Sequence, residues 1–362
     1  MTEREAMAQA LALAVLGEGT TRPNPLVGCL VLAGDEVVGT GYHRAAGEPH
    51  AEAVALDEAG GRARGGTLVV TLEPCAHQGR TPPCADAIIR AGIRRVVAGT
   101  GDPNPLVNGE GVRRLRAAGI EVVLGVLEDA CRAVNAGFLS LHERRRPFVT
   151  VKAAQSLDGQ IAARDGSATW ITREAARTYA HRLRLRHDAV LVGASTVRRD
   201  DPRLTVRLPG VAAPRLRVVV ASTLDLDPAA AVFDGTPRTR VYVPDDAKGG
   251  DALARVADLV RVPRRDAGVD LAAVLSDLAA LDVRSVLVEG GGRTIGAFFA
   301  AGLADDLALF VAPRVIGATE ATPLAALRAA PSPDESAAVR VRATVPLGID
   351  RLILGSIECS PV

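Results

Sequence analysis

Four side chains that suit a catalytic metal site lie in short segments near the start of the sequence. His50 and Glu52 belong to Pro-His-Ala-Glu, and Cys75 and Cys84 end the segments Glu-Pro-Cys and Pro-Pro-Cys. One imidazole and two thiolates leave the fourth position of a tetrahedral zinc ion open for a water molecule or a substrate. Glu52 can face that open position without binding the metal. The pattern therefore predicts a zinc site with a general base beside it.

The same pattern, His-x-Glu followed later by Pro-Cys, is typical of zinc-dependent deaminases. In those enzymes two residues separate the cysteines, whereas eight separate them here. Two other interpretations stay open. A structural zinc site would need a fourth protein ligand, for which His77 is available, and a disulfide between the two cysteines would require an oxidising compartment. The structural site leaves Glu52 without a role, so the catalytic site is favoured.

Predicted helices and strands explain how these side chains are positioned. A buried strand over 67–71 ends shortly before Cys75. A helix opened by His50 and a helix that follows Cys84 place both ligands at helix N-termini, where the dipole favours negative charge. The other expected elements complete a layered α/β domain, with strands over 26–32, 36–42, 95–99 and 121–124 and helices over 3–17, 109–118 and 129–141.

Composition limits the classes of protein to which the chain can belong. Its 362 residues suggest two domains, and the charged run 142–147 predicts the boundary between domains over 1–145 and 146–362. A net charge of +1 and 3% aromatic residues argue against nucleic-acid binding. No apolar run reaches the length of a membrane span. An odd number of cysteines, five, and the lack of a signal-peptide pattern predict a reducing, cytoplasmic setting.

The second half predicts another α/β unit that binds a dinucleotide. A strand over 285–288 runs into Gly290-Gly291-Gly292 and then a helix, which is a pattern that can hold a phosphate. A second polar glycine segment, 193–196, follows the strand over 189–192. Tight packing of strand on helix would explain these glycines equally simply. Arginines at 198, 203 and 207 are suited to bind phosphates or to pair with Asp200 and Asp201.

Together these motifs resemble the family of bifunctional deaminase/reductases of riboflavin biosynthesis. The resemblance covers nearly the whole chain and is carried by the segments 23–25, 50–52, 71–84, 102–105, 156–159, 170–172, 192–197, 200–207 and 289–291. It implies an α/β fold with an N-terminal, cytidine-deaminase-like three-layer domain and a C-terminal, dihydrofolate-reductase-like domain. It also implies a homo-oligomer, a dimer or a tetramer.

For the first domain, the resemblance implies hydrolytic deamination of 2,5-diamino-6-(5-phosphoribosylamino)pyrimidin-4(3H)-one, a pyrimidine ribotide. Zn²⁺ is expected on His50, Cys75 and Cys84, with Glu52 as general base and then general acid. The family's substrate contacts map to Asn24, Arg80 and Asn104.

For the second domain, the resemblance implies reduction of the ribosyl group to ribityl with NADPH, with Lys152 in the active-site strand. The family's cofactor contacts map to Ala154, Trp170, Thr196, Asp200, Ser222, Gly291, Gly292, Arg293, Thr294, Ile295, Gly296 and Ala297. Its substrate contacts map to Ala168, Arg184, Leu204, Arg207 and Glu289. Position 168 is usually serine in the family, and Ser167 lies beside it here.

Two other functions fit parts of the pattern. A cytidine or nucleic-acid deaminase fused to an unrelated nucleotide-binding domain would share the zinc motif. A zinc-stabilised binding module joined to a nucleotide sensor would share it without catalysis. Replacing Glu52 separates these possibilities, because only an enzyme needs a general base at that position.

Overall fold

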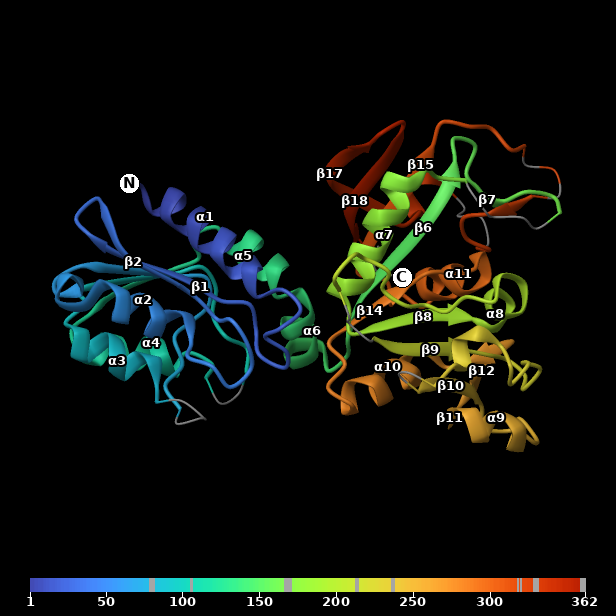
Figure 1. Ribbon diagram of the computed structural model, residues 1–362, viewed down its shortest axis with the longest axis horizontal. Coiled ribbons are helices and arrows are strands. Elements are labelled where there is room, and N and C mark those ends of the chain that lie inside the picture. The colour runs from blue at the N-terminus through green and yellow to red at the C-terminus, as the bar shows by residue number, and fades with distance from the viewer. Residues whose placement is uncertain are drawn as a thin grey trace. The chain divides into compact units, whose positions relative to one another are not determined.

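The computed structural model describes residues 1–77, 82–104, 107–165, 171–211, 215–235, 238–317, 319, 321–327 and 332–358. The chain divides into two compact units, Met1–Arg145 and Arg146–Val362 (Figure 1). No helix among the described residues is both long enough and apolar enough to span a membrane.

The first unit is built on a mixed five-stranded sheet. Its strand order is β2 (Glu36–Tyr42), β1 (Gly28–Ala33), β3 (Thr67–Val70), β4 (Arg95–Ala98) and β5 (Glu121–Leu124). The hairpin β1–β2 is antiparallel and β1 pairs antiparallel with β3, whereas β3, β4 and β5 are parallel. The carboxyl ends of the three parallel strands therefore meet at one edge, where ligands bind in such sheets.

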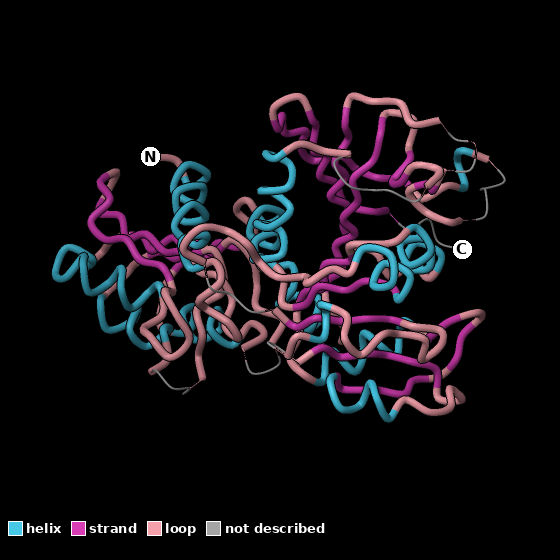
Figure 2. The backbone as a smooth tube through the Cα atoms, turned by 45° about the vertical axis from the view of Figure 1, so that its right-hand side comes forward, coloured by secondary structure: helices cyan, strands magenta, loops and turns pink. Residues whose placement is uncertain are grey.

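Helices cover both faces of this sheet, as the layers in Figures 1 and 2 show. Successive strand residues point to opposite faces, so Val31 packs with α2 (Ala51–Ala59), α3 (Cys84–Ala91) and α4 (Glu110–Ala117). Leu30 packs on the other face with α1 (Glu3–Ala14) and α5 (Glu128–Val134). The predicted three-layer α/β arrangement is confirmed for this unit.

The helix expected over 129–141 is interrupted. Two helices, α5 and α6 (Ala136–Arg144), replace it, and Asn135 lies between them with non-helical backbone angles. The Asn135 side chain accepts a hydrogen bond from the Leu26 N–H at 2.8 Å and donates one to the Leu26 carbonyl at 2.8 Å. These two hydrogen bonds of the Asn135 side chain compete with continuation of the helix. They also tie this point of the chain to the segment that contains Asn24 and Leu26.

The second unit contains a nine-stranded sheet. Its strand order is β11 (Ala257–Val262), β10 (Thr239–Pro244), β9 (Leu216–Val220), β8 (Ala189–Gly193), β14 (Ser285–Val288), β6 (Phe148–Ser156), β15 (Asp306–Ala312), β18 (Asp350–Glu358) and β17 (Ala338–Leu347). The strands from β11 to β15 are parallel, and β18 and β17 add an antiparallel edge. Small two-stranded pairings join β12 (Arg264–Arg265) to β13 (Gly268–Val269) and β16 (Thr322–Pro323) to β7 (Gln160–Ala162).

Helices also pack on both faces of this larger sheet. On one face α10 (Leu271–Ala280) and α11 (Gly292–Ala300) bury Leu275 and Phe298 against the strands. The other face packs against α7 (Glu174–Arg186), α8 (Ala194–Asp200) and α9 (Asp251–Val256). Because β14 lies between β8 and β6, the loops after these three strands meet at the same edge of the sheet.

Candidate functional site

His50, Cys75 and Cys84 converge in the first unit. Their potential ligand atoms all lie within 4.8 Å of one another. His50 Nδ1 lies 3.2 Å from Cys84 Sγ and 3.6 Å from Cys75 Sγ. Zn–S bonds near 2.3 Å and Zn–N bonds near 2.0 Å in a tetrahedron separate such atoms by about 3.5 Å. The three atoms are therefore spaced as ligands of one zinc ion.

Local structure explains this convergence. His50 is the N-cap of α2, and Cys84 is the first residue of α3, as the sequence predicted. Cys75 follows β3, and the backbone N–H of Cys84 lies 3.4 Å from its sulfur as a donor. The next N–H, that of Ala85, donates to the Cys75 carbonyl at 3.0 Å. The N-terminus of α3 thus holds the segment that carries Cys75.

The protonation of the two thiols indicates that this site suits a cation. A hydrogen bond from the Cys84 thiol lowers the pKa of Cys75 to about 4, even though burial opposes the shift. The same hydrogen bond and burial raise the pKa of Cys84. Without a cation the pair carries one negative charge, because two thiolates this close repel each other. A dication would stabilise both thiolates, so the donors fit zinc. Both cysteines are free thiols in this structure.

Glu52 lies beside this cluster and is almost completely buried. Burial raises its pKa to about 7, and the negative charge of Cys75 adds to the shift. A cation held by the three ligands would lower that pKa. The carboxyl group is therefore placed to exchange a proton near neutral pH at the metal centre.

A histidine that sequence reasoning missed connects Asn24 to the metal-binding segment. His43 Nε2 lies 2.9 Å from Asn24 Nδ2, and His43 Nδ1 lies 3.1 Å from the Pro49 carbonyl oxygen. If Nδ1 donates to this carbonyl, Nε2 accepts from the Asn24 amide. Burial lowers the pKa of His43, which is consistent with this neutral form. Its position directly after β2, seven residues before His50, is the sequence signal that was available.

The other expected residues of this unit have different outcomes. Asn104 lies in the loop after β4, which begins at the same sheet edge as the loop that carries Cys75. Arg80 lies outside the described residues. His77 is absent from the group of potential metal ligands found among the described residues. Its buried Nδ1 has no hydrogen-bond partner among them either.

In the second unit, a cavity of about 730 Å³ lies at the carboxyl ends of β6, β8 and β14. The expected residues that line it are Lys152, Ala154, Arg184, Thr196, Asp200, Leu204, Glu289, Gly291, Gly292, Arg293 and Ile295. A second cavity of about 500 Å³ shares Ser195 and Arg293 with the first and is lined by Ser222, Thr294 and Ala297. Two adjacent cavities of this size suit a dinucleotide, with a substrate bound beside one end of that dinucleotide.

Two expected residues of this unit that the structure describes, Gly296 and Arg207, line neither cavity. Gly296 is buried in α11, where an added Cβ would lie 2.6 Å from the Ala326 carbonyl oxygen, so it packs against the chain and lines neither cavity. Ala168 and Trp170 lie outside the described residues. The segment 193–196, predicted as a glycine loop, instead consists of the last residue of β8 and the first turn of α8. Of the two predicted glycine segments, the one before α11 is the loop.

That glycine segment fits a phosphate-bearing cofactor. Gly290 has φ +124°, which other residues rarely adopt. Gly291 is the N-cap of the nine-residue helix α11, and an added Cβ at Gly292 would lie 2.8 Å from the Pro323 carbonyl oxygen. Gly292 therefore packs against the chain, whereas a Cβ added at Gly290 would meet no atom within 4 Å and one at Gly291 only Thr196 Oγ1 at 3.4 Å. The open space beside Gly290 and Gly291 lets a ligand approach the backbone N–H groups at this helix N-terminus.

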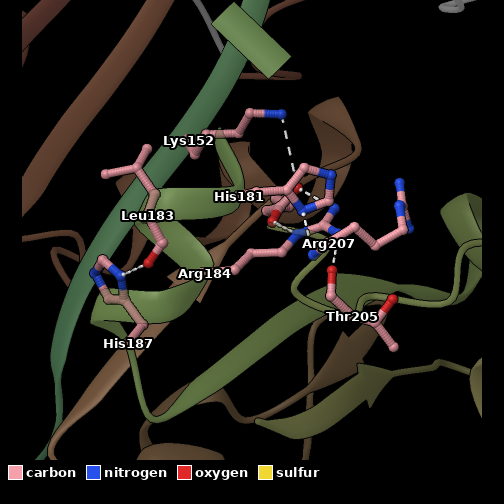
Figure 3. A network of polar contacts seen from close by, with 8 residues as sticks. Lys152, His181, Leu183, Arg184, His187, Thr205 and Arg207 are labelled. Atoms are coloured by element: carbon pink, nitrogen blue, oxygen red, sulfur yellow. Dashed lines mark hydrogen bonds and ion pairs between the residues drawn. The ribbon is translucent and has the colours of Figure 1, made fainter. Parts of the chain in front are cut away.

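A network of polar contacts joins Lys152, Arg184 and Glu289, which line the larger cavity (Figure 3). Arg184 Nε lies 2.5 Å from Glu289 Oε1, and Arg184 Nη2 lies 3.0 Å from Oε2. Lys152 Nζ lies 3.6 Å from Oε2 of the same carboxylate. Burial raises the pKa of Glu289, but Arg184 and Lys152 outweigh it and bring the pKa to about 2. Glu289 is therefore an anion that fixes two cations beside the cavity.

His181 extends the network to Arg207 and was also missed from the sequence. The Arg207 N–H donates to His181 Nδ1 at 3.3 Å, and Arg184 donates to the neighbouring Thr205 carbonyl at 2.9 Å. Burial lowers the pKa of His181 to about 4, and the charges of Arg184 and Arg207 contribute. His181 is thus a neutral acceptor that orients the segment containing Arg207. Arg207 does not line the cavity itself.

Comparisons with known proteins match both units. The RibD C-terminal domain family matches residues 147–342, and the cytidine and deoxycytidylate deaminase zinc-binding region matches residues 1–100. Riboflavin biosynthesis protein RibD of Aquifex aeolicus is 43% identical over 316 residues, which cover 87% of this chain and 88% of that protein. The protein of the same name from Escherichia coli is 40% identical over 328 residues, covering 88% and 89%.

Solved structures agree with these matches. RibD of Acinetobacter baumannii superimposes with a TM-score of 0.86 at 34% identity, covering 98% of this chain and 99% of that one. A diaminohydroxyphosphoribosylaminopyrimidine deaminase/5-amino-6-(5-phosphoribosylamino)uracil reductase from Thermotoga maritima gives 0.85 at the same identity and coverage. The expected α/β fold, a cytidine-deaminase-like domain followed by a dihydrofolate-reductase-like domain, is confirmed, and the second domain is the RibD reductase domain.

Proposed function

This chain belongs to the family of riboflavin biosynthesis protein RibD, and we propose that residues 1–145 catalyse its deamination step and residues 146–362 its reduction step. It is a bifunctional enzyme of riboflavin biosynthesis, a hydrolase and an oxidoreductase. The first substrate is 2,5-diamino-6-(5-phosphoribosylamino)pyrimidin-4(3H)-one. Its deaminated product is then reduced to 5-amino-6-(5-phosphoribitylamino)uracil. The observation that carries the deaminase assignment is the convergence of His50, Cys75 and Cys84 beside the buried Glu52.

In the deaminase site, His50, Cys75 and Cys84 hold the metal, and Glu52 moves the protons. Bound zinc supplies the Lewis acidity that makes a water molecule nucleophilic near neutral pH. Glu52 accepts a proton from this water as its oxygen bonds to the amino-bearing ring carbon. The carboxyl group then delivers the proton to the departing amino group, and ammonia leaves. Asn24, held by His43, and Asn104 orient the pyrimidine, with Arg80 as a further substrate contact.

In the reductase site, Lys152 and Glu289 face the reacting end of the cavity. NADPH, when bound, supplies the hydride. The ammonium group of Lys152 is oriented by Glu289 and positions or protonates the substrate. Arg184, which lines the cavity, and Arg207, whose backbone N–H is held by His181, are the proposed arginine contacts to the substrate. Among the described residues, Ala154, Thr196, Asp200, Ser222, the segment 291–295 and Ala297 are the proposed cofactor contacts, and Leu204 is a substrate contact. The family resemblance adds Trp170 and Gly296 as cofactor contacts and Ala168 as a substrate contact.

We also place the enzyme in the cytoplasm as a homo-oligomer, a dimer or a tetramer, acting on small molecules. The family resemblance supports this proposal. Sedimentation of the purified chain at several concentrations would test the oligomeric state.

A coupled assay tests the proposed activities. Purified zinc-loaded protein is given freshly prepared diaminopyrimidine ribotide, and ammonia release and NADPH oxidation are followed. Ammonia followed by NADPH oxidation supports both sites and their order. Glu52→Gln should retain zinc and lose about 10²- to 10⁴-fold in the rate of ammonia release. Wild-type protein that releases no ammonia would exclude the deaminase, and an unaffected Glu52→Gln variant would exclude the assigned base.

A further inference from the structure

We propose that Glu73 is a positioning residue of the deaminase, which holds the loop that carries Asn104 at the sheet edge where the Cys75 segment also begins. The inference rests on the proposed function, because it takes Asn104 to be a substrate contact. Glu73 lies two residues before Cys75 and is only 5% exposed. A buried carboxylate is costly unless it accepts hydrogen bonds, so its partners indicate what it does.

The partners of Glu73 are backbone N–H groups at both ends of one loop. Glu73 Oε2 accepts from the Asp102 N–H at 3.3 Å and from the Gly109 N–H at 3.0 Å. Asn104 lies between these two donors, so one oxygen atom closes the loop that contains it. Within the loop, the Asn104 N–H donates to Asp102 Oδ1 at 2.8 Å. The Val107 and Asn108 N–H groups also donate to the Asn104 carbonyl, at 2.8 and 3.0 Å. Glu73 therefore anchors both ends of a loop whose internal hydrogen bonds hold Asn104.

The other oxygen of Glu73 binds the helix that follows this loop. Glu73 Oε1 accepts from the Val112 N–H at 3.1 Å, in the first turn of α4. Negative charge is favourable at a helix N-terminus, and this N–H has no partner inside the helix. Gly111 brings the helix into direct contact, since an added Cβ would lie 1.8 Å from the Pro74 carbonyl oxygen. The segment 73–75 and the N-terminus of α4 thus form one rigid junction.

This junction gives Glu73 a function distinct from that of Glu52. Glu73 donates no ligand to the metal cluster, and its carboxylate oxygens are occupied by backbone groups. Its effect on catalysis must pass through the loop that it closes. Loss of that closure would let the Asn104 amide move relative to the zinc ligands, and misplacement of about 1 Å can cost about 10²-fold in rate.

A double-mutant cycle tests the proposal. Glu73→Gln, Asn104→Ala and the double variant are compared in the full chain by kcat/KM for ammonia release. We expect about 10- to 100-fold loss for each single variant and no further loss in the double variant, since both changes remove the same interaction. Glu110→Gln is the matched control, because Glu110 is an exposed glutamate on the first turn of α4 and pairs with Arg113. It should behave as wild type.

Three further measurements distinguish positioning from general support. Zinc content and the visible spectrum of the cobalt-substituted protein should be unchanged in Glu73→Gln, because the ligands stay in place. Reduction of the deaminated intermediate by the same variant should also be unchanged. If Glu73→Gln does not fold, the cycle is repeated with Glu73→Asp, which retains the charge.

Several results would overturn the inference. These are additive losses in the double variant, an Asn104→Ala variant with wild-type kinetics, or zinc loss from folded Glu73→Gln protein. Failure of wild-type protein to release ammonia would instead reject the proposed function, so the two failures are distinguishable.

Discussion

Arg184 and Glu289 form a two-point ion pair inside the second unit, with Nε–Oε1 and Nη2–Oε2 distances of 2.5 and 3.0 Å. Their side chains are 13% and 6% exposed. Removing Arg184 leaves the buried Glu289 carboxylate with Lys152 as its remaining described cation, whereas removing both partners leaves only the partly exposed Lys152 ammonium without a carboxylate. The pair therefore has separable effects on stability and on activity.

We expect Arg184→Met to lower the free energy of unfolding of this unit by about 3 kcal/mol. The double variant Arg184→Met/Glu289→Met should recover most of that loss. Neither variant should reduce the deaminated intermediate at a normal rate, and both should still release ammonia. Urea unfolding followed by the fluorescence of the single tryptophan, which belongs to residues 146–362, measures the stability. Equal destabilisation by the single and double variants would contradict the argument.

The same pair predicts how acid affects stability. Although burial raises the pKa of Glu289, its cationic neighbours bring it to about 2 in the folded chain, against an ordinary value of 4.5. The folded protein then binds this proton less readily than the unfolded chain does. The contribution of the ionised group, about 3 kcal/mol, is complete above about pH 4.5 and is lost as the pH falls toward 2.

Glu289→Gln should therefore be less stable than wild type at pH 7, and the difference should shrink as the pH falls. Urea unfolding at several pH values between 3 and 7 measures it. A difference that stays constant over this interval would show that ionisation of Glu289 does not stabilise the fold.

The zinc ligands could be predicted from local sequence patterns, whereas the contacts of Glu289 could not, and the reason is physical. Each candidate zinc ligand comes with its own strand or helix end, so local patterns around His50, Cys75 and Cys84 were sufficient to expect the cluster. The contact of Glu289 with Lys152 and Arg184 requires β14 to lie between β8 and β6. That order is set by long-range packing, and only the family resemblance brought these residues together beforehand.

Residues that act through the backbone were harder to find from the sequence. Glu73 binds three N–H groups, and Asn135 binds both backbone groups of Leu26. Any residue except proline supplies such partners, so the sequence carries no pairing signal. For this reason the helix predicted over 129–141 is confirmed in its helical residues but missed the interruption at Asn135. The segment 245–267 is charged and rich in glycine and alanine, and its hydrophobic residues show no clear periodicity. It contains α9, β11 and β12.

Arg114 provides a further test of how α4 supports the metal site. Its Nη1 donates to the Ala76 carbonyl at 3.2 Å, and its Nη2 lies 2.7 Å from Asp86 Oδ1. One side chain thus joins the segment after Cys75 to the helix that begins at Cys84. We expect Arg114→Ala to weaken zinc affinity about tenfold, as loss of residues that orient ligands does.

Competition with a chromophoric chelator measures that affinity. Arg113→Ala is the control, because Arg113 is 70% exposed and pairs only with Glu110 among the interactions described. Similar zinc affinities for the two variants would show that the Arg114 contacts do not support the ligands.

Removal of the metal should separate the two activities. Treatment with a strong zinc chelator should abolish ammonia release, because His50, Cys75 and Cys84 all belong to residues 1–145. Reduction of the deaminated intermediate should continue, since the cavity beside Lys152 belongs to the other unit. Added zinc should restore ammonia release. Parallel loss of both activities would show that the metal supports the whole chain rather than one site.

Close packing at Gly111 predicts a steric variant of the deaminase unit. A Cβ at this position would lie 1.8 Å from the Pro74 carbonyl oxygen and 3.3 Å from Glu73 Oε1, so α4 must move away from the segment that carries Cys75. Gly111→Ala should cost about 2 kcal/mol of stability in this unit and reduce ammonia release, while reduction of the intermediate persists. Gly61→Ala is the matched control, because no atom lies within 4 Å of a Cβ added there. Thermal unfolding and both assays on the two variants decide the matter, and a Gly111→Ala variant that matches Gly61→Ala would show that the junction tolerates separation.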